Sequence, residues 1–178
     1  MSDALRKMRE AGPLVHCITN YVAMNISANV LLAAGASPAM IHTSEETLDF
    51  AKIVASLTVN IGTLSPHWVE GMKAAVKAAI AAKVPWVFDP VAHFATPYRA
   101  SVTQELMAMA PTILRGNASE ILALSGQSST ARGVDATDPV AVAEASRVPV
   151  PAATSWWDGW FGGGGAEATE RSTVGNTV

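Results

Sequence analysis

The sequence has 178 residues, of which 49% are hydrophobic and 15% charged, and its formal net charge is -3 at pH 7. This length suits one domain with a sizeable core, and the low charge predicts much buried surface, in a covered parallel sheet or at a subunit interface. The small negative charge offers no basic footprint for nucleic acid, and no apolar run reaches the roughly 20 residues that span a bilayer.

Cysteine usage and the N-terminal segment predict a cytoplasmic protein. Cys17 is the only cysteine, which excludes an intramolecular disulfide framework, and residues 1–12 are charged, without the apolar stretch of a signal peptide. We interpret Cys17 as a small buried hydrophobic residue. The four histidines have no metal-ligand spacing, which favours structural or surface roles for them: His16, His42, His67 and His93.

Short apolar runs of strand length alternate with segments of helical periodicity along the chain. Between the first two runs, apolar residues from 22 to 34 recur mostly on one helical face, and Gly35 can end that helix. Five strands are predicted, at Leu14–Ile18, Ala39–Ile41, Leu57–Asn60, Trp86–Phe88 and Thr112–Leu114.

Helix start signals fill the gaps between these strands. Thr43 and Glu46 have the spacing of a capping box, which predicts a helix from there through residue 53. Ser65 followed by Pro66 opens the clearest helix, and residues 98–110 are helical in pattern. Asn117 and Glu120 form another capping position, and a last helix is predicted from Asp138.

This alternation predicts an α/β fold with a parallel sheet covered by helices on both faces. Ligands of such sheets bind outside the carboxyl ends of the strands. The segments that follow the strands therefore become the candidate site: ITN, MIHTSEE, NIGTL, DPVAHFATPYR and RGNASE.

Three residues at these strand ends have the chemistry of a phosphate and metal site. Asp89 ends the fourth strand, where its carboxylate can hold Mg²⁺ or simply begin a turn before Pro90. Arg115 follows the fifth strand and offers a fork that matches phosphate. Glu120 can complete the Asn117 capping box, share a metal with Asp89, or do both.

Two further polar or soft side chains follow the first two strands. Asn20 can cap the next helix or face a ligand, and Asn25 lies close behind it. Met40 is a core residue by default, but it could also present a soft side chain to a small heteroaromatic ligand. The phosphate motifs G-x-x-x-x-G-K-[ST] and G-x-G-x-x-G are absent, and the glycines at Gly162–Gly165 follow no strand.

Four segments in the same order resemble hydroxyethylthiazole kinase, a thiamine-salvage family of the ribokinase-like superfamily. They begin at Pro13 (PLVHCITNYVAMNISANVLLAAGASPAMIHTSEE), Leu57 (LTVNIGTLS), Val87 (VFDPVAHFATPYR) and Ile113 (ILRGNASEILALSG), and the likeness extends to about Ser146. The resemblance implies a ribokinase-like three-layer sandwich with a mostly parallel central sheet. It also implies phosphoryl transfer from ATP, with Mg²⁺, to the hydroxyl of 4-methyl-5-(2-hydroxyethyl)thiazole.

The resemblance assigns roles to the candidate residues. It implies that Met40 contacts the thiazole with Asn20 near it, that Arg115 contacts ATP phosphates, and that Asp89 and Glu120 serve the magnesium site. It further implies a homotrimer with active sites between subunits, and no nucleic-acid or membrane partner. Some members have glycines in place of Ala92 and Phe94, so this chain departs from the family in the loop after Asp89.

The end of the sequence departs further. The family continues with more strands and a Gly-Thr-Gly-Cys turn, which holds the transferring phosphoryl group, and this sequence has no Gly-Thr-Gly. We expect a partial kinase domain over residues 1–147, with the sandwich incomplete at its C-terminus. We expect an aberrant, disordered tail over 148–178, from a frameshift or as a lineage-specific extension. A kinase with impaired activity is therefore expected, and no catalytic residue is assigned; a non-catalytic thiazole-binding or subunit-assembly protein is the alternative.

Overall fold

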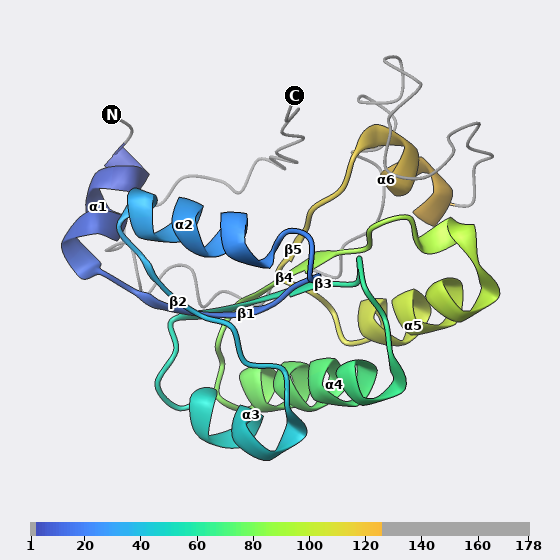
Figure 1. The fold of residues 1–178 in the computed structure, drawn as a ribbon, viewed down its shortest axis with the longest axis horizontal. Coiled ribbons are helices and arrows are strands. Elements are labelled where there is room, and N and C mark those ends of the chain that lie inside the picture. The colour runs from blue at the N-terminus through green and yellow to red at the C-terminus, as the bar shows by residue number, and fades with distance from the viewer. Residues whose placement is uncertain (1–2, 126–178) are drawn as a thin grey trace, which may run out of the picture.

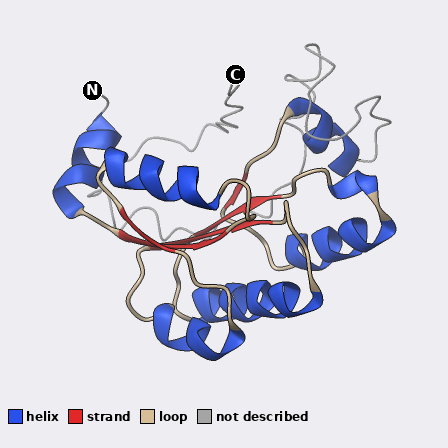
Figure 2. Ribbon diagram, viewed as in Figure 1, coloured by secondary structure: helices blue, strands red, loops and turns tan. Residues whose placement is uncertain are grey.

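The computed structural model describes residues 3–125 and shows a parallel sheet between two layers of helices (Figures 1 and 2). Its five strands have the order β2-β1-β3-β4-β5, and each neighbouring pair is parallel. Helices α1 and α2 lie on one side of the sheet, and α3, α4 and α5 lie on the other (Figure 1). The strands are β1 Leu14–Ile18, β2 Ser37–Ala39, β3 Ser56–Asn60, β4 Trp86–Asp89 and β5 Ile113–Leu114. The helices are α1 Asp3–Ala11, α2 Met24–Ala34, α3 Ser44–Phe50, α4 Pro66–Ala81, α5 Pro97–Met107 and α6 Ala118–Leu124, with a 3-10 turn, η1, at His93–Ala95.

The predicted parallel α/β fold is confirmed, but the second strand was placed two residues too late. The prediction was Ala39–Ile41, whereas β2 pairs with β1 through Ser37, Pro38 and Ala39. Pro38 has no N–H to donate, which an edge strand tolerates. The carbonyl of Ile41 accepts instead from the Nε2 atom of His16, at 2.8 Å. The apolar run from which the strand is predicted therefore extends beyond the end of β2 at Ala39.

The predicted start of helix α3, Ser44–Phe50, agrees with the structure better than its predicted end does. Gly35 ends α2 in the left-handed conformation, at φ 100°, as predicted. Helix α3 begins after Thr43 but ends at Phe50, three residues before the predicted end at Ile53. Thr43 donates to the Glu46 carboxylate, at 3.2 Å, and makes no side-chain bond to the helix backbone, so the predicted capping box is not formed there.

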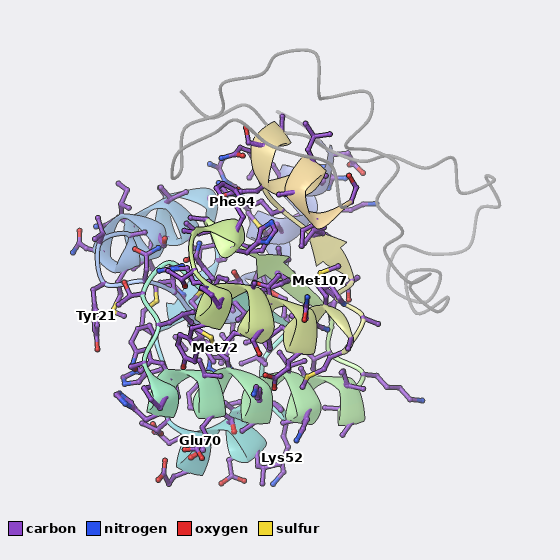
Figure 3. All side chains as sticks on the ribbon, turned by 90° about the vertical axis from the view of Figure 1, so that its right-hand side faces the viewer. Tyr21, Lys52, Glu70, Met72, Phe94 and Met107 are labelled. Atoms are coloured by element: carbon purple, nitrogen blue, oxygen red, sulfur yellow. The ribbon has the colours of Figure 1, made fainter. Side chains whose placement is uncertain are left out.

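The core lies between the sheet and the helices α4 and α5. Trp68, Met72 and Val76 of α4 are fully buried against residues of β3 and β4, including Val59 and Phe88. In Figure 3, Met72 points into the molecule, whereas Glu70 of the same helix lies on its outer side. Helix α4 therefore has one apolar face, as its spacing predicts.

One glycine lets a neighbouring loop approach α4 closely. A Cβ atom placed on Gly71 would lie 1.9 Å from the backbone oxygen of His42. A side chain of any size is excluded there, because heavy atoms do not approach so closely without a shift of the backbone. Gly71 thus lets the turn after β2 lie directly against α4.

The order of the strands defines where a ligand crevice is expected. The chain passes from β1 outward to β2, and then returns to the other side of β1 at β3. In open parallel sheets, ligands bind at the carboxyl ends of the strands where this reversal occurs. The point of reversal lies between Ile18 and Asn60, and the two strand ends beyond it carry Asp89 and Arg115.

Helix α2 lies over the sheet, but its apolar residues are largely uncovered. No residue of α2 is buried by the part of the chain that the structure describes, and Ile26, Val30 and Leu32 are 57–60% exposed. Across residues 3–125, no helix has the length and apolarity to cross a membrane. The predicted helix from Asp138, the domain boundary after residue 147 and the tail at 148–178 lie outside the described residues.

Candidate functional site

A buried carboxylate and an exposed guanidinium meet at the carboxyl edge of the sheet. Asp89 ends β4 with its side chain 8% exposed, and Arg115, directly after β5, forms an ion pair with it while remaining 64% exposed. Pairing between β4 and β5 places the two residues side by side, because the Arg115 amide donates to the carbonyl of Phe88 at 2.8 Å. Burial raises the pKa of Asp89, and the positive charge of Arg115 opposes this shift.

Glu120 joins this cluster from the first turn of α6. Its N-terminal capping box is confirmed: Asn117 accepts from the Glu120 amide, and the Glu120 carboxylate accepts from the Asn117 amide, each at 2.9 Å. The other carboxylate oxygen of Glu120 accepts from the Ala92 amide at 3.0 Å. Burial raises the pKa of Glu120, and the nearby charge of Asp89 acts in the same direction.

The loop after Asp89 is fixed to α6 at two points. In addition to the bond from Ala92, the ring of His93 donates from Nε2 to the backbone oxygen of Glu120 at 2.9 Å. Ala92 itself is left-handed, with φ 47°, a conformation that L-alanine adopts at a cost. Glycine would adopt this conformation without that cost.

Asn60 connects the predicted residues and was not singled out from the sequence. It lies opposite Asp89 in the pairing of β3 with β4, and its side chain lowers the pKa of that carboxyl. The Asn60 side-chain oxygen accepts from Asn20 and from the Gly62 amide, each at 2.9 Å. Asn20 in turn accepts from the Ala23 amide at 2.8 Å, before α2 begins. A chain of polar contacts therefore crosses the point where the strand order reverses. An asparagine as the last residue of a buried strand was the signal that could have identified it.

Met40 lies directly after β2 and belongs to the same edge of the sheet. It is half-buried and packs against the small cluster of Val15, Cys17 and Ala36. Its neighbour Ile41 is held by the buried ring of His16, whose pKa burial lowers. Met40 therefore lies beside the end of β1, the strand that precedes Asn20. Because β1 and β3 separate β2 from β4 in the sheet, Met40 is distant from Asp89 and Arg115 along the sheet edge.

The sequence-based interpretation of Cys17 agrees with its surroundings. The thiol is buried, and desolvation raises its pKa to about 11, so it is neither a ready nucleophile nor a metal ligand. Of the histidines, His16 and His93 are buried and bonded to backbone oxygens, which are structural roles. Within the described residues, no group of three or more His, Cys, Asp and Glu side chains could by itself hold a metal ion.

The arrangement suits a ligand that brings its own oxygen atoms. Mg²⁺ in proteins typically has one or two carboxylates, with waters and substrate phosphates completing its shell. Asp89 and Glu120 are two buried carboxylates, and the charge of Asp89 is close enough to raise the pKa of Glu120, so the pair fits this pattern. The exposed face of Arg115 adds donors for phosphate oxygens.

Comparisons with known proteins agree with this geometry. The model of the hydroxyethylthiazole kinase family matches residues 5–153. A hydroxyethylthiazole kinase of Rhizobium johnstonii is 63% identical over 142 residues, which is 80% of this chain and 53% of that protein. One of Gemmatimonas aurantiaca is 61% identical over 145 residues, covering 82% and 52% of the two chains.

A solved structure shares the fold. The hydroxyethylthiazole kinase protein of Pyrococcus horikoshii OT3 superposes with a TM-score of 0.68 at 44% identity, over 70% of this chain and 49% of that one. The chain thus spans about half the length of the curated relatives that it matches. Because the family model covers most of the sequence and the sheet matches a solved member, this chain belongs to the hydroxyethylthiazole kinase family.

Proposed function

We propose that this chain forms the metal-, nucleotide- and thiazole-binding part of a kinase. The reaction is transfer of the γ-phosphoryl group of ATP to the hydroxyl of 4-methyl-5-(2-hydroxyethyl)thiazole, in thiamine salvage. The observation that carries the proposal is the pairing of buried Asp89 with exposed Arg115 at the carboxyl edge of the sheet, beside Glu120. Phosphoryl transfer depends mainly on positioning and charge, which this cluster provides.

Asp89 and Glu120 are the residues that would hold Mg²⁺. When bound, the ion would supply positive charge for the phosphate oxygens. Asp89 is kept in place by Asn60 and Arg115, and Glu120 by the amides of Ala92 and Asn117. Each carboxylate oxygen has a second lone pair, so these bonds leave acceptor capacity for a metal ion or its water shell.

Arg115 is the residue that would bind the nucleotide. Its guanidinium forms an ion pair with Asp89 on one side and is open to solvent on the other. A fork of this kind can hold a carboxylate and a phosphate oxygen at once, because it presents five N–H donors in one plane. The thiazole would lie towards Met40 and Asn20, on the other side of Asn60.

The exposed apolar face of α2 supports self-association, and we propose the homotrimer that the family resemblance implies, with the site near a subunit boundary. Apolar residues that are uncovered in one copy are those that a second copy would bury. A kinase of this kind would act in the cytoplasm, where ATP is available and where the free thiol of Cys17 stays reduced.

Two measurements test the proposal. We expect isothermal titration calorimetry to show binding of Mg²⁺·ATP, and Arg115→Ala to weaken it by about 1.5–3 kcal/mol, or tenfold and more. Arg6→Ala, which removes an exposed ion-pairing arginine of α1, serves as the control and should leave the affinity unchanged. Absence of nucleotide binding by the folded chain would contradict the proposal.

Turnover separates the kinase from the non-catalytic alternative. The printed sequence has no Gly-Thr-Gly turn, and loss of even one preorganised donor costs roughly 10²–10³ in rate. We therefore expect this 178-residue chain to form thiazole phosphate at least about 10²-fold more slowly than the same chain extended with a family C-terminal half. Comparable rates, measured by mass spectrometry of the product, would show that the missing turn is dispensable. Thiazole binding without any product would favour the non-catalytic alternative.

A further inference from the structure

Arg99 of α5 makes an unusual set of contacts behind the candidate site. Its guanidinium donates to the backbone oxygens of Ile61, Gly62 and Val91, at 2.8, 2.8 and 3.1 Å. Within the described residues, no acidic side chain forms an ion pair with it. The N–H donors of this half-buried arginine are therefore satisfied by backbone oxygens of the two loops that it joins, and not by a carboxylate.

The two loops are those that carry the central residues of the site. Ile61 and Gly62 follow Asn60, and the Gly62 amide bonds to the Asn60 side chain. Val91 lies two residues beyond Asp89, next to Ala92, whose amide bonds to Glu120. The turn after β3 and the turn after β4 are also joined directly, because the Ile61 amide donates to the backbone oxygen of Asp89 at 3.2 Å.

The chemistry of the side chain suits this bridging role. Three carbonyl oxygens that face one another repel, and a positive group between them removes that cost. The planar fork of arginine can reach two loops at once with fixed geometry, which the single ammonium of lysine does less well. Because Arg99 comes from a third element, α5, it can hold the two turns without occupying the ligand side of the sheet edge.

We propose that Arg99 is a positioning residue, which ties the turn after β3 to the turn after β4 and so holds Asn60 and Asp89 in register for metal and nucleotide binding. The identity of the ligand rests on the proposed function, whereas the tie between the loops does not. Arg99 touches neither substrate nor metal in this role. Its effect passes through the backbone of residues 60–62 and 89–92.

The test uses Arg99→Met and Arg99→Lys in the full chain, with Arg6→Met as a matched control on α1. Amide hydrogen exchange is measured at Gly62 and Ala92, together with core amides of β3. We expect Arg99→Met to lose protection at Gly62 and Ala92 by about tenfold or more while the core amides keep theirs. Arg99→Lys should lie between wild type and Arg99→Met, and Arg6→Met should match wild type.

The second readout is the affinity of each folded protein for Mn²⁺·ATP. We expect it to fall about 10–100-fold in Arg99→Met, as it does when groups that orient metal ligands are removed, with partial recovery in Arg99→Lys. Unchanged exchange at Gly62 and Ala92 would overturn the inference, and so would loosened loops with unchanged affinity, since Arg99 would then be structural only. If the wild-type chain binds no nucleotide, the proposed function fails, and the exchange data alone decide whether Arg99 holds the loops.

Discussion

At the scale of single residues, the candidate site holds groups in states that cost stability. Asp89 and Glu120 both have pKa values raised by burial, and Arg115 and several amides offset only part of that cost. Ala92 adopts a left-handed backbone between them. Sites that bind charged ligands commonly store such costs, because a buried carboxylate becomes favourable only when a cation reaches it.

Asp89→Asn is therefore expected to weaken Mg²⁺·ATP binding without destabilising the fold. The pKa of Asp89 is higher in the folded state than its unfolded value of 3.8. Ionisation of Asp89 therefore lowers the free energy of unfolding, and this loss grows as the pH rises from 3.8 through the folded pKa. The neutral amide removes that cost and can still accept a bond from Arg115. Thermal unfolding at pH 7 should give a melting temperature equal to or above that of wild type, and calorimetry an affinity lower by about tenfold or more.

The stability gain of Asp89→Asn should narrow as the pH falls towards 3.8, because wild-type Asp89 then becomes neutral as well. A melting temperature well below wild type at pH 7 would show that the ion pair with Arg115 outweighs burial. Glu105→Gln, which removes an exposed partner of Lys73, is the control and should change little at either pH.

Ala92→Gly should stabilise the loop after β4. A left-handed conformation costs an alanine about 1–2 kcal/mol, whereas glycine adopts it freely but loses about 0.5–1 kcal/mol of chain entropy. The net gain in the free energy of unfolding is thus at most about 1.5 kcal/mol, measured by urea denaturation. Ala95→Gly, on the same loop at an exposed position without positive φ, should be neutral or destabilising. A loss of stability in Ala92→Gly would contradict the argument.

At the scale of elements, two capping boxes of the same pattern behave differently. Asn117 and Glu120 form the reciprocal bonds, and Glu120 is buried. Thr43 and Glu46 are more exposed to water and bond side chain to side chain. The box that forms is the buried one, where an amide without a partner would cost more than it does at the more exposed pair of Thr43 and Glu46.

Packing between α4 and the turn after β2 depends on Gly71. Gly71→Ala should destabilise the protein by about 1–3 kcal/mol, because the new methyl group meets the His42 backbone 1.9 Å away, and this outweighs the gain of about 1 kcal/mol in helix propensity. Lys77→Ala, on the exposed face of the same helix, should stay within about 0.5 kcal/mol of wild type. Urea denaturation measures both, and equal stability of Gly71→Ala and wild type would rule out the close approach.

At the scale of the whole molecule, α2 presents a group of apolar side chains that the described residues 3–125 leave uncovered. Its apolar residues Ile26, Val30 and Leu32 are exposed, and the helix has no charged residue. A wild-type chain is expected to sediment as a trimer, and the pair Ile26→Lys with Val30→Lys to sediment as a single copy that stays folded. Leu48→Lys, 67% exposed on α3, is the matched control and should leave the trimer intact. A wild-type monomer at micromolar concentration would contradict this expectation.

The sequence by itself determined the class of fold and the alternation of strands and helices that gives a parallel sheet, and it predicted which strand ends form the candidate site. Five apolar runs, the glycine after α2 and the Asn117 capping box are properties of contiguous residues, so local patterns suffice to predict them. The rule that ligands bind at strand carboxyl ends then selected Asp89 and Arg115 before any contact between them was known.

Only the tertiary structure decided which side chains meet. The extent of β2 depends on its pairing with β1 and on the bond from His16 to Ile41, neither of which is encoded near residue 40. Asn60 reaches Asp89, and Arg99 reaches Ile61 and Val91, because the order of the strands places these turns side by side. Except for the contact of Arg99 with Val91, which is 8 residues away, these contacts join residues more than 20 apart in the chain. They are set by how strands pair and helices pack, so local periodicity does not predict them.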